Sequence, residues 1–157
     1  MRLNAPGNPG RTAAGFGLVE VLVASVVLAV GLVGGLLALI GGVQAIRHAL
    51  FASAAVRLAA DLGERIRANP QAGDAYALPA DRAQPSPAND CFAAHCDPAA
   101  LAAADLYAWQ QSVQATLPGA RTTVRVTVAG GVPRYTIALE WSDGGRAPRR
   151  HSSVVAP

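Results

Sequence analysis

The first pattern in the chain is a long run of apolar residues close to its N-terminus. From Val21 to Ile46 no side chain is ionisable. A helix of about 20 apolar residues crosses the hydrocarbon core of a bilayer, and this run is longer. The apolar core of an ordinary secretory signal has only about 7–15 residues. The run therefore predicts a membrane-spanning helix.

After this run, apolar residues continue at the three- and four-residue spacing of an amphipathic helix. Pro70 ends the helix, because a proline disfavours the helical conformation in the residue before it. The two patterns together predict one helix over residues 16–69. A domain this small cannot cover a helix of that length. We therefore expect residues 16–46 to lie in the membrane or against other apolar helices.

The remaining residues, 47–157, are expected to form a head outside the membrane. Prolines spread over residues 70–97 predict an irregular loop there. Asp97 followed by Pro98 is a favourable helix start, with an acidic N-cap before a proline. A second helix is accordingly predicted over residues 98–117.

Apolar and polar residues alternate on both sides of Gly130 and Gly131, which predicts a β-hairpin over residues 121–142. The apolar face of the hairpin is expected to pack against Leu58, Leu62 and Ile66 of the first helix. Trp109 of the second helix is expected to be a core anchor. A short third strand is expected within residues 150–155. The predicted fold class is α+β, a long N-terminal helix on a small antiparallel sheet with a second helix.

Charge gives little indication of a partner. The 157 residues include thirteen arginines, no lysine and ten acidic residues, for a net charge of +3. Arg2 and Arg11 precede the apolar run, so the rest of the chain is almost neutral. Charge alone therefore does not indicate nucleic-acid binding. Arg121, Arg125 and Arg134 could contact DNA or an acidic partner, but a solvated sheet face is the favoured interpretation.

The sequence offers no pattern typical of catalysis. His48, His95 and His151 are scattered, and none has an evident serine or aspartate partner nearby in sequence. Phosphate-binding loops, zinc-protease motifs and nucleophile elbows are absent from the sequence. We therefore predict no enzymatic activity, no catalytic residue, no cofactor and no small-molecule substrate.

Two cysteines, Cys91 and Cys96, lie five positions apart within the loop. An even pair of cysteines outside the cytoplasm usually forms a disulfide. His95 lies beside Cys96, but three candidate ligands crowded into six residues fit a structural zinc site poorly. We therefore predict a disulfide that fixes a turn before the second helix, and no metal.

The start of the apolar run holds the clearest functional candidate. Glu20 directly precedes the run, where a carboxylate in hydrocarbon costs about 2.5–3.5 kcal/mol. Gly15 and Phe16 lie just before it. If the chain were cut between them, the new α-amine of Phe16 would lie one helical turn from Glu20, on the same helix face.

Segment 15–24, Gly-Phe-Gly-Leu-Val-Glu-Val-Leu-Val-Ala, resembles the processing site of type IV pilins and pseudopilins. In that family a prepilin peptidase removes a short basic leader, and the new N-terminal residue is methylated. The resemblance implies a leader over residues 1–15, cleavage between Gly15 and Phe16, and N-methylation of Phe16. It also implies a pilin-like fold whose outer helix half, residues 16–46, lies in the membrane or the filament core.

Later parts of the chain resemble the PilV-type minor pilins, also called type IV pilus modification proteins. The resemblance rests on the run Glu-Arg-Ile-Arg-Ala-Asn-Pro over residues 64–70 and on the cysteine pair. A tryptophan-containing helix before Leu-Pro-Gly, residues 117–119, adds to it. It implies a subunit that primes or modifies a type IV pilus, with roles in adhesion and twitching motility. The implied partners are the prepilin peptidase and other minor and major pilins.

The expected location is the bacterial inner membrane, crossed once, and then the pilus filament. Arg2 and Arg11 before the apolar run favour a cytoplasmic N-terminus and a periplasmic head. In the filament, Glu20 of one subunit is expected to pair with the Phe16 amine of an adjoining subunit and to set axial register. Two alternatives stay open, a minor pseudopilin of a type II secretion system and a single-pass periplasmic binding module that never polymerises.

Overall fold

The computed structural model describes residues 15, 17–80, 82–87, 90–91, 93, 95–142, 144 and 147–157. The predicted leader, apart from Gly15, and the predicted methylation site Phe16 lie outside the described residues. The chain divides into two compact units, Met1–Gln44 and Ala45–Pro157. One helix, α1 (Leu18–Ala68), contributes residues to both units.

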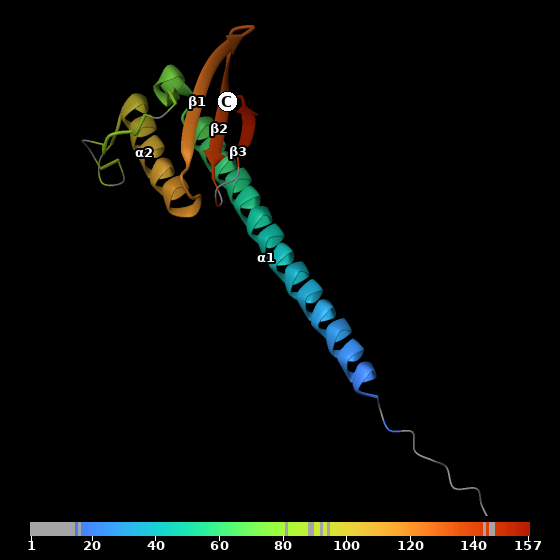
Figure 1. Cartoon of the computed structure of the whole chain (residues 1–157). Helices are drawn as coiled ribbons and strands as arrows, with labels where there is room; N and C mark the ends of the chain where they lie inside the picture. The colour runs from blue at the N-terminus through green and yellow to red at the C-terminus, as the bar shows by residue number, and fades with distance from the viewer. Residues whose placement is uncertain are drawn as a thin grey trace, which may run out of the picture. The chain divides into compact units, whose positions relative to one another are not determined.

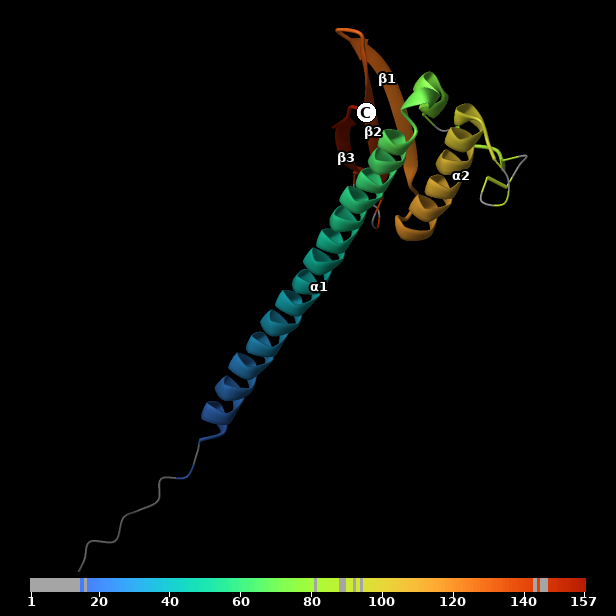
Figure 2. The ribbon, with the colours of Figure 1, turned by 180° about the vertical axis from the view of Figure 1, so that it is seen from behind.

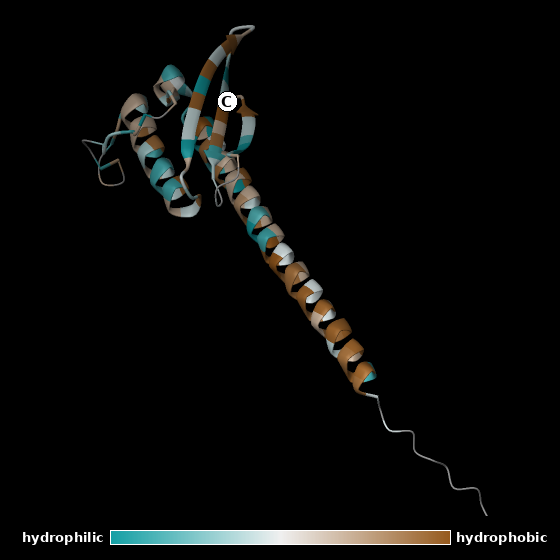
Figure 3. Ribbon diagram, viewed as in Figure 1, coloured by the Kyte–Doolittle hydropathy of each residue, from teal (hydrophilic) through white to brown (hydrophobic). Residues whose placement is uncertain are grey.

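In the first unit, α1 is an apolar helix that begins directly after Gly17. The Gly17 carbonyl accepts hydrogen bonds from the amides of Glu20 and Val21, at 2.9 and 3.3 Å. The Ser25 hydroxyl donates a hydrogen bond to the Val21 carbonyl at 2.8 Å, so this polar group is satisfied within the helix. Most of this segment is brown in Figure 3, with paler positions between, which shows its predominantly apolar character.

The second unit contains a three-stranded antiparallel sheet in the order β1-β2-β3. Its strands are β1 (Arg121–Ala129), β2 (Val132–Trp141) and β3 (Arg149–Val155). The C-terminal part of α1 covers one face of this sheet, and α2 (Pro98–Thr116) lies beside it (Figures 1 and 2). The predicted α+β fold class is confirmed, and the third strand begins one residue before the expected range.

A single core joins these elements. The predicted α1 residues Leu62 and Ile66 are fully buried in it, and Leu58 is half-buried against it. Trp109, the expected core anchor, is fully buried and donates its indole N–H to the Leu58 carbonyl at 2.8 Å. The sheet contributes the alternate residues that face α1, namely Val124, Tyr135, Ile137, Leu139 and Trp141.

The prediction of an irregular loop is wrong for its first part. Residues Pro70–Tyr76 form the short 3₁₀-helix η1. Leu78 then pairs with Val124 of β1 through two backbone hydrogen bonds of 2.9 Å. Tyr76 and Leu78 are both buried, so the segment is part of the core and covers some of the β1 edge.

Candidate functional site: the N-terminal junction and the head that carries it

The junction at the start of α1 is open on all sides that the structure describes. Gly15 and Gly17 are exposed, and a Cβ atom built on either would meet nothing within 4 Å. The peptide bond that the sequence marks for cleavage joins Gly15 to Phe16. Since Phe16 lies outside the described residues, cleavage there and methylation of Phe16 stay predictions.

Glu20 lies in the first turn of α1, and its side chain is exposed. A carboxylate there interacts favourably with the positive end of the helix dipole, by about 0.3–1 kcal/mol. Glu20 is also the only ionisable residue between Leu18 and Ile46. The local interaction is small beside the cost of placing this charge in an apolar surrounding, so Glu20 needs a further partner wherever the helix is buried.

The described residues of the first unit give the apolar surface of α1 no cover. Every leucine, valine and isoleucine from Leu18 to Val43 exposes more than half of its surface. Among the described residues, α1 is the one helix long and apolar enough to cross a membrane. That test rests on length and composition, which an N-terminal signal sequence also satisfies. Surface of this kind is stable only against lipid or other apolar helices.

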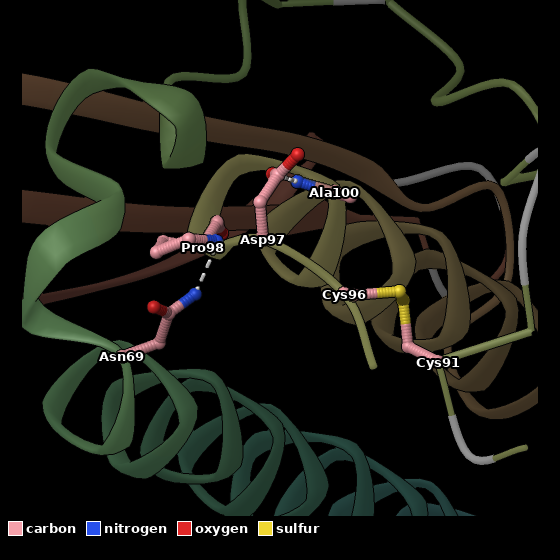
Figure 4. The surroundings of a disulfide bond; sticks show 6 residues. All are labelled: Asn69, Cys91, Cys96, Asp97, Pro98 and Ala100. Carbon is pink, nitrogen blue, oxygen red and sulfur yellow. Dashed lines mark hydrogen bonds between the residues drawn. A yellow bond between two sulfur atoms is a disulfide. The ribbon is translucent and has the colours of Figure 1, made fainter. Parts of the chain in front are cut away.

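The predicted disulfide between Cys91 and Cys96 is present, with 5.4 Å between the two Cα atoms (Figure 4). The next residue, Asp97, caps α2 by accepting a hydrogen bond from the Ala100 amide at 2.8 Å. The Asn69 side chain, at the end of α1, donates to the Pro98 carbonyl at 2.8 Å. The bridged turn is therefore adjacent to the point where α2 is attached to α1.

A partly buried polar network, which the sequence did not reveal, holds η1 between the two helices. Asp105 of α2 accepts hydrogen bonds from Arg65 at 3.1 Å and from the Tyr76 hydroxyl at 2.7 Å. Arg65 also pairs with Asp61 at 3.0 Å, as its four-residue spacing predicts. The only sequence indication was a single carboxylate, Asp105, on an otherwise alanine-rich helix.

Three groups in the head have pKa values shifted by their surroundings. Burial, with the hydrogen bond to Asp105, raises the pKa of Tyr76 well above its ordinary value. Burial also raises the pKa of Tyr135, with a smaller contribution from the negative charge of Asp74. For Arg65 burial lowers the pKa, but the hydrogen bonds to Asp61 and Asp105 outweigh it and the pKa is raised. Arg65 therefore stays charged throughout the physiological range.

Two protein-family models match parts of the chain. Residues 10–36 match the prokaryotic N-terminal methylation motif, and this range includes the Gly15–Phe16 junction, Glu20 and the start of α1. Residues 40–107 match the family described as type IV pilin Tt1218. The chain is similar to type IV pilins. Neither curated proteins nor solved structures give a match to it.

The pilin-like chain thus carries a family match over the second half of α1, η1 and the first half of α2, and the methylation motif over residues 10–36. The motif implies processing by a prepilin peptidase and assembly with other pilins. Pilins are structural subunits, which agrees with the prediction of a protein that is not an enzyme. Together with the apolar helix, the motif suggests anchoring in the membrane before a pilus-related role.

Among the described residues, no group of three or more histidine, cysteine or acidic side chains could hold a metal ion.

Proposed function

We propose that this chain is a minor pilin of the PilV type, a subunit that primes or modifies a type IV pilus. The observation that supports it most is the position of the methylation motif. The match to residues 10–36 includes Arg11, the Gly15–Phe16 junction and the first turns of an exposed apolar helix. A filament built from such helices buries this apolar surface, which a head of this size leaves uncovered.

In this proposal, Glu20 and the α-amine of Phe16 act between subunits. Cleavage after Gly15 and methylation leave a charged secondary amine on Phe16. Placed beside Glu20 of the adjoining subunit, it offsets the cost of burying either charge alone. The pair contributes more to axial register than to net stability, because desolvation cancels much of the attraction.

Substitution of Glu20 tests this role. Glu20→Ala is expected to enter the inner membrane at the level of the wild type, since it makes the helix more apolar. Its incorporation into filaments is expected to fall at least tenfold, which quantitative blotting of sheared pili against the membrane fraction would measure. Glu64→Ala, a change of the same charge on the exposed face of α1 in the head, is the matched control. Equal incorporation of Glu20→Ala and wild type would contradict the proposal.

The two alternatives predict different outcomes of deletion and processing. A pseudopilin of a type II secretion system would leave pili intact when deleted and would reduce secretion. A single-pass binding module that never polymerises would keep its leader and would be missing from every sheared filament. The pilin proposal expects deletion to reduce piliation or twitching motility with secretion unchanged.

A further inference from the structure

The apolar run of α1 ends at an arginine. Residues from Val21 to Ile46 carry no ionisable side chain, and Arg47 follows directly. In Figure 3 the mostly brown part of α1 gives way to teal positions further along the helix. The next arginine is Arg57, and His48 is the one ionisable residue between the two. Arg47 is therefore the residue at which the uncharged run stops.

The guanidinium of Arg47 has no acidic neighbour on the helix. Its neighbours three and four positions away are uncharged, namely Val43, Gln44, Leu50 and Phe51. After Glu20 the first carboxylate along the chain is that of Asp61. Arg47 is exposed and forms no ion pair with another described residue. A partner for this charge therefore has to come from the surroundings of the helix.

The spacing of the charges at the two ends of the apolar run matches the thickness of a bilayer. Glu20 and Arg47 both belong to α1, and the rise between them is about 40 Å at 1.5 Å per residue. A bilayer is about 40–45 Å thick with its headgroups, of which about 30 Å is hydrocarbon. When Glu20 lies at one surface, Arg47 therefore reaches the headgroups of the other. A shift of the helix along its axis would move one of the two charges toward the hydrocarbon.

The acceptors in the headgroup layer are the phosphates of phospholipids. Arginine binds a phosphate through two parallel hydrogen bonds, and its guanidinium is more weakly hydrated than the ammonium of lysine. The aliphatic stem of an arginine also lies readily along apolar surface while the charged group stays at the interface. Both properties suit a residue placed at the end of an apolar helix.

We propose that Arg47 binds phospholipid phosphate at the membrane surface next to the head and thereby fixes the depth of α1 in the unassembled subunit. The inference rests on the proposed function, because it requires α1 to span a membrane. It adds the residue and the lipid group that hold the helix at one depth. A second copy of the chain is the less favoured partner, because its carboxylate on this part of the helix, Glu20, lies at the opposite end of the apolar run.

The test measures the depth of α1 with the full chain in vesicles of phosphatidylethanolamine and phosphatidylglycerol. A nitroxide label is attached to Ala52→Cys, because Ala52 is exposed and the two native cysteines are joined in a disulfide. Electron paramagnetic resonance then compares collisions of the label with oxygen and with a water-soluble nickel complex. The label is expected to favour the nickel complex, since Ala52 lies about 7 Å beyond Arg47 along the helix axis.

Arg47→Leu is expected to move the label deeper by about one helical turn, or ~5 Å. The stretch of α1 without an arginine or a carboxylate then continues to Val56. Arg57→Leu is the matched control, because it removes the same charge from an exposed position on the same helix. It is expected to leave the depth of the label unchanged. In vesicles of a galactolipid, which has no phosphate, the difference between wild type and Arg47→Leu is expected to shrink by more than half.

An inserted chain whose depth is the same with and without Arg47 would overturn this inference alone. An equal difference in the galactolipid would overturn the phosphate contact, because the charge by itself would then set the depth. A wild-type depth that changes with the ratio of protein to lipid would assign Arg47 to a second copy of the chain. A wild-type chain that does not insert into vesicles would instead contradict the membrane anchoring in the proposed function.

Discussion

At the scale of single residues, Tyr76 shows how the head fixes its η1 segment. Its hydroxyl donates to Asp105 and accepts a hydrogen bond from the Asn69 side chain at 3.4 Å. Asn69 follows the last residue of α1, whereas Asp105 belongs to α2. The phenol therefore connects both helices from within the core. Loss of a hydrogen bond to a partly buried carboxylate costs about 1–3 kcal/mol.

The raised pKa of Tyr76 predicts how the stability of the head changes at alkaline pH. Its pKa and that of Tyr135 are raised in the folded head above the ordinary value of 10.0. Below pH 10.0 the folded and the unfolded chain both keep their phenolic protons, and the contribution of these tyrosines to the free energy of unfolding is complete. Above it the unfolded chain loses these protons first, so the free energy of unfolding falls as pH rises.

Tyr76→Phe is therefore expected to lower the free energy of unfolding by about 1–3 kcal/mol at pH 8. It is also expected to flatten the decline above about pH 10 without abolishing it, since Tyr135 remains. Urea unfolding followed by tryptophan fluorescence, at a series of pH values, measures both effects. A variant with the wild-type slope above pH 10 would show that Tyr76 does not titrate in this way.

At the scale of elements, Gly63 sets how closely α1 approaches β3. Glycine in a helix interior makes the helix less stable than alanine does, by about 1 kcal/mol. In the structure Gly63 is buried, and an added Cβ atom would lie 3.0 Å from a methyl carbon of Val155. The weak helix former is thus the residue that allows the helix to pack directly on the sheet.

Gly63→Ala is expected to destabilise the head by about 1–2 kcal/mol, because overpacking outweighs the gain in helix propensity. Removing the opposing methyl groups in Gly63→Ala/Val155→Ala is expected to recover part of the loss. Gly42→Ala is the control, since a Cβ there meets nothing within 4 Å. Thermal unfolding of the four proteins measures the effect. A stabilised Gly63→Ala would mean that the contact relaxes without cost.

The elements that could be predicted from sequence are those with a long, regular pattern. The apolar and amphipathic runs predicted α1, and Asp97-Pro98 predicted the start of α2. The alternation of apolar and polar residues predicted β1 and β2. Segment η1 could not be predicted, because seven residues are too few to show a period. The Asp105 network and the role of Gly63 depend on contacts between distant elements, which spacing along the chain does not contain.

The same limit applies to charge. The arginines of β1 and β2 were visible in the sequence, but Arg150 joins them only through the β2–β3 register. Net charge averages over the whole chain, whereas the strand register decides which charges share one face. The predicted processing junction, by contrast, needs no contact between distant elements, because the residues that suggest it are consecutive, 15–20.

At the scale of the whole molecule, the chain consists of two parts with different requirements. The head has its own core, a disulfide and a polar network, which together stabilise a small domain. The first unit has an apolar helix with no cover of its own and one carboxylate at its start. The account therefore depends on what happens to the N-terminus.

The most direct measurement is the mass of the N-terminal peptide from the membrane and sheared-pilus fractions. We predict a chain of 142 residues, the 157 of the full sequence less the 15 of the leader, beginning with N-methylated Phe16. A chain that keeps residues 1–15 in a strain with normal pili would contradict the account. Its apolar helix would then be a membrane anchor and not a filament subunit.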